Sequence, residues 1–102
     1  MLSKKYNDII FIMPIFNKSL NIKETINIYL SNPDQVLFNE KAIGFTSFNE
    51  QGEFSIISHH TNFRSVISKN ITITTTSGEK KVFKINKGVL SFSNDNLEVY
   101  VV

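Results

Sequence analysis

The chain lacks several residue types on which common functional sites depend. Its 102 residues include no cysteine, four glycines and two prolines, and Ala42 is the single alanine. Without cysteine there is no disulfide, no thiolate nucleophile and no cysteine-based zinc site. The few glycines form neither a P-loop nor a GxGxxG motif, and HExxH and GxSxG are also missing. We therefore expect no enzyme active site and no cofactor on this chain.

The chain also lacks a strong charge of either sign and a long apolar run. Eleven Lys and Arg residues are set against nine Asp and Glu residues, which gives a net charge of +2. This balance does not indicate nucleic-acid binding, because only Arg64 could form a bidentate contact with phosphate or guanine. No stretch reaches the roughly 18 apolar residues of a membrane-spanning helix. We expect neither a nucleic-acid partner nor direct insertion into a membrane.

The segment closest to such a run is IIFIMPIF, residues 9–16, which Pro14 interrupts. It has the length of the apolar region of a signal peptide, but no small-residue cleavage site follows it. We interpret residues 1–20 as an N-terminal extension that packs on the domain or on a partner. The alternatives are a signal peptide and a true start at Met13.

Apolar and polar residues alternate from residue 22 to residue 30, which is typical of a half-buried strand. The predicted inner face carries Ile22, Glu24, Ile26, Ile28 and Leu30. Tyr29 lies on the opposite face, as does Tyr100 in the last predicted strand. These two tyrosines could cover the rim of the core or anchor a partner.

Further short strands follow at intervals marked by turn residues. We expect a pair of strand pieces in residues 36–48, bent near Glu40 or Gly44, where Gly44 would mark a bulge. Single strands are expected at 53–57, 63–67, 71–76, 80–85, 89–93 and 97–102. Inward residues of these strands would include Phe63, Ile67, Ile71, Ile73, Phe83 and Ile85. Lysines in residues 79–87 are expected to be solvated along a hairpin edge. The predicted fold is all-β: an antiparallel sandwich or flattened barrel of about eight to ten short strands in one domain, residues 21–102.

The stretch GEFSIISHH, residues 52–60, places Glu53 close to the only two histidines in the sequence. Adjacent residues of an extended segment point to opposite faces, so His59 and His60 would not bind one metal ion together. A third ligand, such as Asp34 or Asp95, would follow no spacing rule, and we expect no metal site. Two interpretations stay open from the residues alone: solvated loop histidines, or a polar contact with another protein.

The order of motifs from residue 52 to residue 102 resembles the N-terminal β-sandwich of the epsilon subunit of F-type ATP synthase, which is called delta in mitochondria. A GEF strand leads into a histidine loop, two strands flank SGE, and KGVLSF and LEVYVV end the chain. Residues 21–51 are similar to the family's first strand, turn and second hairpin. The resemblance covers about residues 21–102.

The residues of the histidine loop match the family pattern unevenly. Gly52, Glu53 and Phe54 stand at the GEF positions, and His60 aligns with the family's histidine. Ser58 replaces a proline, His59 replaces a glycine, and Thr61 and Asn62 replace Ala-Pro. The resemblance implies that this loop contacts the membrane c-ring through Glu53, Ser58, His59, His60 and Asn62. It does not indicate which residues contact the gamma subunit.

The resemblance implies a central-stalk subunit that links gamma to the c-ring at the cytoplasmic face of a cell membrane, as in bacteria. Torque from ion flow would pass through a rigid domain to the catalytic head, and the partners would supply all nucleotide chemistry. Since the sequence stops at Val102, we expect no C-terminal helical hairpin, no autoinhibition through it and no bound nucleotide. The alternatives are a free-standing β-sandwich that binds another protein, and an enzyme that uses His59 or His60.

Overall fold

The computed structural model describes residues 24–102, and all of their regular structure is β. The strands are β1 (Ile26–Ser31), β2 (Val36–Asn49), β3 (Gly52–Ile57), β4 (Phe63–Thr75), β5 (Lys80–Ser93) and β6 (Asn96–Val101). The predicted N-terminal extension, the alternative start at Met13 and the inward position of Ile22 lie outside the described residues. The prediction of an all-β domain is confirmed.

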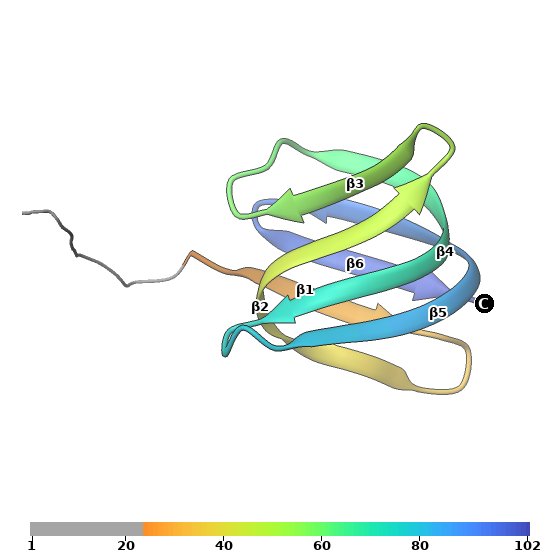
Figure 1. Cartoon of the computed structure of the whole chain (residues 1–102), viewed down its shortest axis with the longest axis horizontal. Helices are drawn as coiled ribbons and strands as arrows, with labels where there is room; N and C mark the ends of the chain where they lie inside the picture. The colour runs from red at the N-terminus through yellow and green to blue at the C-terminus, as the bar shows by residue number, and fades with distance from the viewer. Residues whose placement is uncertain (1–23) are drawn as a thin grey trace, which may run out of the picture.

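Five of the six strands form a closed barrel (Figure 1). The strand order is β1-β6-β5-β4-β2-β3, and β1 also pairs with β2, which closes the ring. β3 lies outside the ring and pairs only with β2. All neighbouring strands are antiparallel except the first and the last, β1 and β6, which pair in parallel from Asn27↔Asn96 to Ser31↔Tyr100. The sheet is therefore mixed, and the prediction of a purely antiparallel arrangement was wrong at this pair.

The predicted number of strands was also too high, because three predicted breaks do not separate strands. β2, β4 and β5 are 14, 13 and 14 residues long. β2 continues through its predicted bend, while β4 and β5 continue through SKN and NKG, which resemble turns in sequence. In β4 the SKN segment forms an irregularity at Lys69, where φ is 75° and the register with β5 shifts. In β2 the register shifts between Ala42 and Gly44, which confirms the bulge expected there. Such bulges bend a strand without ending it.

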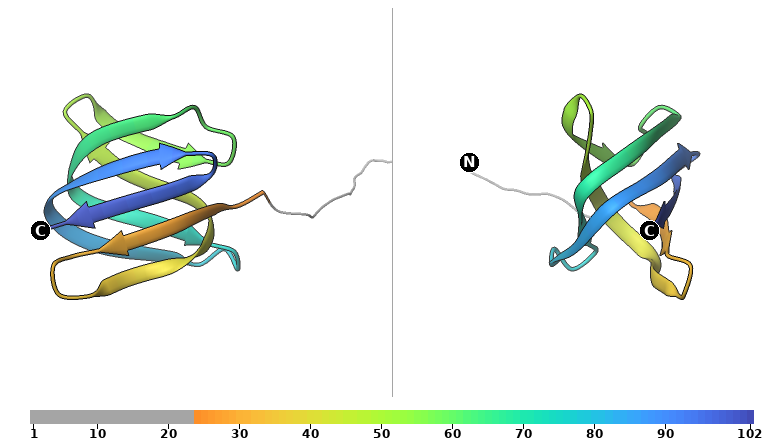
Figure 2. Two further views of the ribbon diagram at one scale, coloured as in Figure 1. Left: turned by 180° about the vertical axis from the view of Figure 1, so that it is seen from behind. Right: turned by 90° about the vertical axis from the view of Figure 1, so that its right-hand side faces the viewer.

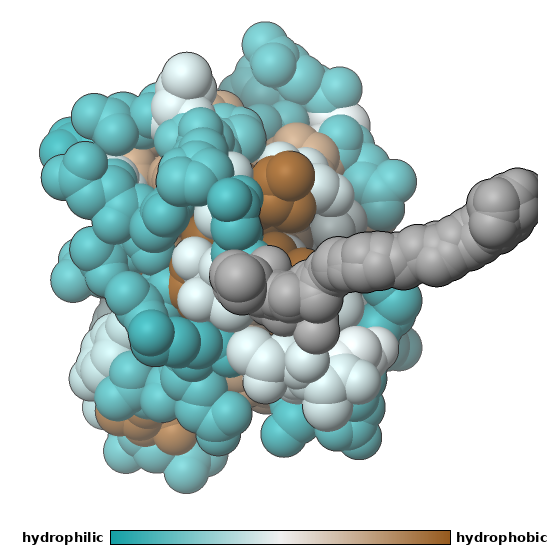
Figure 3. All heavy atoms as spheres, turned by 90° about the vertical axis from the view of Figure 1, so that its left-hand side faces the viewer, coloured by the Kyte–Doolittle hydropathy of each residue, from teal (hydrophilic) through white to brown (hydrophobic). Residues whose placement is uncertain are grey.

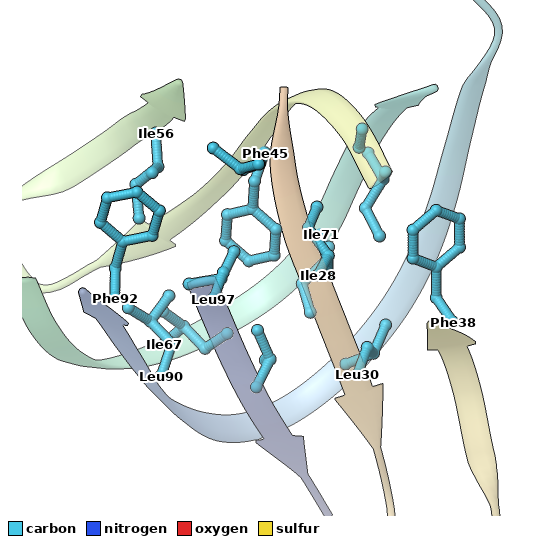
Figure 4. Packing of buried hydrophobic residues seen from close by; sticks show 14 of the residues in the cluster. Ile28, Leu30, Phe38, Phe45, Ile56, Ile67, Ile71, Leu90, Phe92 and Leu97 are labelled. Atoms are coloured by element: carbon cyan, nitrogen blue, oxygen red, sulfur yellow. The ribbon is translucent and has the colours of Figure 1, made fainter. Parts of the chain in front are cut away.

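The bends allow the long strands to wrap around one core (Figures 1 and 2). The first part of β2 pairs with β1, and its second part lies between β3 and β4. The core is almost entirely Ile, Leu, Val and Phe, including Ile28, Leu30, Phe45, Ile56, Ile67, Ile71, Phe92 and Leu97 (Figure 4). Alternation predicted most of these positions correctly, while Phe63, Phe83 and Ile85 are partly buried against the same cluster.

Ser47 is a fully buried polar side chain in this barrel, and its hydroxyl has a hydrogen-bond partner. Ser47 has no exposed surface, and its hydroxyl donates to the Asn70 carbonyl oxygen at 2.8 Å. Because an unpaired buried hydroxyl would cost roughly 1–3 kcal/mol, this bond makes the burial tolerable. The contact also ties β2 to the irregular part of β4, next to Lys69.

Candidate functional site

The loop between β3 and β4, residues 58–62, is referred to below as the histidine loop. It lies at one end of the barrel, together with the start of the described chain and the β5–β6 turn (left side of Figure 1). Figure 3 looks onto this end and shows a largely hydrophilic surface around a smaller hydrophobic area. The end is therefore suited to a hydrated contact rather than to burial in a core.

His59 holds the histidine loop against the β5–β6 turn. Its backbone N–H donates to Asp95 Oδ1 at 2.8 Å, and its own φ is 66°. A left-handed conformation costs a non-glycine residue about 1–2 kcal/mol, so the carboxylate of Asp95 supports a backbone shape that histidine disfavours. The position is the one where the ATP synthase epsilon family, on the motif match, has glycine.

The His59 side chain lies between two carboxylates on the surface. Its Nε2 is 3.4 Å from Glu24 Oε1, and its Nδ1 is 4.0 Å from Asp95 Oδ2. The Ser58 hydroxyl donates to the same Glu24 oxygen at 3.1 Å. The side chains of His59 and Glu24 are 71% and 64% exposed, so these atoms remain available to a partner.

Sequence reasoning missed Glu24 and Asp95 as members of this site. The hydrogen bond between Asp95 and His59 joins residues 36 positions apart, and Glu24 and Ser58 are 34 apart. Asp95 was considered only as a metal ligand that no spacing rule supported, and not as a hydrogen-bond partner of the loop. Both Asp95 and the preceding Asn94 have positive φ, as a type I′ turn requires. No local signal links these turns, because only closure of the barrel brings them together.

His60 is positioned differently from its neighbour. It is partly buried, and its ring meets the rings of Phe63 and Phe92 edge-on, with centroids 5.7 and 5.9 Å apart. Its Nδ1 is 2.7 Å from the Thr61 carbonyl oxygen. Because a carbonyl oxygen can only accept, Nδ1 carries the proton. His60 thus covers the end of the core, and its backbone N–H closes the turn by donating to the Ile57 carbonyl oxygen at 3.2 Å.

The two histidines diverge, as predicted, but a turn separates them rather than the alternation of a strand. His59 faces Glu24 and Asp95, whereas His60 faces the phenylalanines. Within residues 24–102 no group of three or more His, Cys, Asp or Glu side chains is arranged to hold a metal ion. The arrangement offers hydrogen-bond donors and acceptors, and not a chelating pair.

Glu53 and Asn62 complete the set of predicted contact residues. Asn62 is exposed in the histidine loop, beside Phe63. Glu53 is exposed near the start of β3, opposite Phe48, at the β2–β3 turn. At 3.3 Å per residue, the length of β3 from Glu53 to Ile57 places it about 13 Å along the strand from the loop. The structure therefore brings Ser58, His59, His60 and Asn62 together and separates Glu53 from them.

The family of the chain follows from its sequence over the whole barrel. Residues 25–102 match the family described as the beta-sandwich domain of the ATP synthase delta/epsilon chain. The chain belongs to this family. The resemblance predicted from the GEF strand, the histidine loop and the last two strands is thus confirmed. Among the described residues there is no helix long and apolar enough to cross a membrane.

Two solved structures contain chains of similar fold. One chain of the Euglena gracilis mitochondrial ATP synthase (OSCP, F1 and c-ring) superposes with a TM-score of 0.73 at 19% identity, over 80% of this chain and 53% of that one. A chain of the Tetrahymena thermophila mitochondrial ATP synthase (central stalk and c-ring) gives 0.67 at 17% identity, over 78% and 65%. This chain spans about half to two thirds of their lengths. No curated protein matches the sequence.

Proposed function

We propose that the chain is a central-stalk subunit of an F-type ATP synthase and links the gamma subunit to the c-ring. The observation that carries the proposal is the family match over residues 25–102, which includes every strand of the barrel. In this role the chain performs no chemistry itself. It works at the cytoplasmic face of the membrane as a peripheral part of the complex, and the catalytic head makes or hydrolyses ATP.

The mechanical properties of the barrel support a role in passing torque. Five strands close on each other through paired edges, and the core leaves Phe45, Ile67 and Leu30 at most 1% exposed. Interiors packed to this extent deform little under load. A body of this kind moves with gamma as one piece and does not absorb the rotation by internal bending.

The histidine loop is the proposed contact with the c-ring. Ser58, His59 and Asn62 offer polar groups to a hydrated surface, where Glu24 accepts a hydrogen bond from the Ser58 hydroxyl and Asp95 accepts one from the His59 N–H. His60 stabilises the shape of the loop by packing its ring on the rings of Phe63 and Phe92. Glu53 was part of the same predicted contact, but it lies at the other end of β3, and so it provides a test of which end of the barrel meets the ring.

Co-purification tests this function directly. The tagged full-length chain is expressed in the organism from which it comes, extracted in a mild detergent and isolated. The proteins that accompany it are then identified by mass spectrometry. We expect the gamma and c subunits among the recovered proteins, together with the alpha and beta subunits. Recovery of the chain without gamma would overturn the proposal and favour a free-standing binding module. A Ser58→Ala/His59→Ala variant should retain gamma and lose part of the c subunit.

A further inference from the structure

The outer surface of the barrel carries a patch that the histidine loop does not explain. Tyr29, Val66, Val89 and Tyr100, here called the Tyr–Val face, point outward and are 42% to 56% exposed. They belong to β1, β4, β5 and β6, which lie side by side in the view from behind (Figure 2, left). Single exposed apolar residues are ordinary, but four on adjoining strands are a contiguous surface.

The strand register makes the Tyr–Val face continuous. Val66 lies opposite Val89, and Val89 lies opposite Tyr100. Tyr29 lies opposite Glu98 in the parallel pair of β1 and β6. Together with Ser91 and Arg64 these residues line an open groove of about 670 Å³. The lining of the groove combines apolar side chains with the carboxylate of Glu98 and the guanidinium of Arg64.

The most apolar segment of the sequence lies next to this groove along the chain. IIFIMPIF, residues 9–16, is separated from the first described residue, Glu24, by residues 17–23. Seven residues can span up to about 23 Å when extended. Tyr29 is five residues along β1 from Glu24, or about 17 Å. The segment is therefore long enough, and attached closely enough, to fold back onto the face.

Charge and backbone chemistry agree with this occupant. The segment is preceded by Asp8 and followed by Lys18, while the groove has Arg64 on β4 and Glu98 on β6. Arg64 and Glu98 are two strand spacings apart, or about 10 Å. An extended segment that ran from β4 towards β1 would therefore place one flanking charge near its opposite, Lys18 near Glu98, and would end beside the strand to which it is joined. Pro14 removes one backbone donor from the segment, and contact through side chains across a face does not need an unbroken ladder of backbone hydrogen bonds.

We propose that residues 9–16 dock across the Tyr–Val face in the free subunit. The crossing from β4 to β1 covers three strand spacings, or about 14 Å, so four or five residues of the segment are enough to fill the groove. The Ile and Phe side chains of the segment cover the exposed valines and tyrosines, and Lys18 lies towards Glu98. This inference is independent of the assignment to the ATP synthase stalk.

The missing cysteines allow a disulfide test in the full-length chain. Phe11→Cys is combined with Val89→Cys in the groove or, as the matched control, with Val82→Cys on the same strand. Val82 is 60% exposed and lies outside the groove residues. Under mild oxidation at low protein concentration, we expect the intramolecular disulfide with position 89 to form at least about tenfold faster, because docking raises the effective concentration of the two thiols.

Equal rates at the two positions, no disulfide, or disulfides only between chains would each overturn the proposal, the last in favour of a second copy as the occupant. A second measurement does not rely on cysteine pairs. Ile10→Asp/Ile12→Asp in the full chain should increase oxidative labelling of Tyr29 and Tyr100, measured peptide by peptide, at least about twofold, since burial of the rings protects them. Unchanged labelling of both tyrosines would contradict docking.

Discussion

The wall of the barrel and the histidine loop are held in shape by different kinds of interaction. The wall consists of long strands whose apolar side chains fill a common core, with Phe45 and Ile67 at most 1% exposed. The loop keeps its shape through a few side-chain contacts, chiefly those of Asp95 and His60. Substitutions in the wall should therefore change the free energy of unfolding, whereas substitutions in the loop should change contacts with a partner and leave the fold in place.

The largest expected effect is in the wall. Phe45→Ala removes a 1% exposed ring from the centre of the core and should lower the free energy of unfolding by about 3–5 kcal/mol. Urea denaturation followed by circular dichroism measures this loss. Val82→Ala, at a 60% exposed position, is the control and should change stability by less than about 0.5 kcal/mol. Equal losses in both variants would refute the assignment of the core.

A single methyl group should be enough to disturb the wall at Gly88. A Cβ there would lie 2.8 Å from Val101 Cγ1 and 2.9 Å from the Tyr100 carbonyl oxygen. Since backbone of β6 must move, Gly88→Ala should cost about 1–3 kcal/mol. At Gly44 the nearest atoms to an added Cβ are 3.6 and 3.8 Å away, so Gly44→Ala should be tolerated. Thermal unfolding of the two variants compares them, and a larger loss at Gly44 would contradict the register of β5 and β6.

Asp95 should matter more than its place in a surface turn suggests. Asp95→Ala removes the acceptor for the His59 N–H and places alanine at a φ of 61°, which together should cost about 1–2 kcal/mol. Asp95→Asn keeps an acceptor oxygen and a residue that tolerates this φ, and should retain most of the stability. Hydrogen exchange of the His59 amide should be faster in the alanine variant. Equal exchange in all three proteins would show that the bond does not hold the loop.

The smallest expected effects separate the two histidines. His60→Ala removes the ring that packs on Phe63 and Phe92 and should cost about 1 kcal/mol. His59→Gly relieves a φ of 66° while giving up exposed contacts, so its effect should be within about 0.5 kcal/mol of zero. Parallel urea titrations measure both. A greater loss for His59→Gly would mean that the contacts with Glu24 and Asp95 are stronger than surface exposure allows.

The sequence predicted the wall better than the loop for a physical reason. Burial of Ile26, Ile28, Ile71 and Ile73 follows from alternation within single strands, which is a local property. Lys69 was read as part of a turn, because the sequence does not reveal that pairing with β5 continues past a lysine with positive φ. The parallel pairing of β1 with β6 depends on contacts between the two ends of the domain, and a local pattern contains no information about it.

Because local sequence patterns do not show which distant residues meet in space, they also predicted the membership of the histidine-loop site only in part. The family pattern identified the histidine loop, but it grouped Glu53 with His60 because they are near each other in sequence. An extended strand converts that short separation into opposite ends of β3. Conversely, Glu24 and Asp95 are distant in sequence and adjacent to His59 in space.

Site-specific cross-linking in the assembled complex tests the central claim most directly. A photoreactive label is attached to Ser58→Cys in the loop or, in a matched sample, to Glu53→Cys at the other end of β3, and the complex containing the labelled chain is irradiated. The account predicts an adduct with the c subunit from position 58 and little or none from position 53. An adduct with the c subunit from position 53 and none from position 58 would contradict it, because the barrel would then meet the ring with its opposite end.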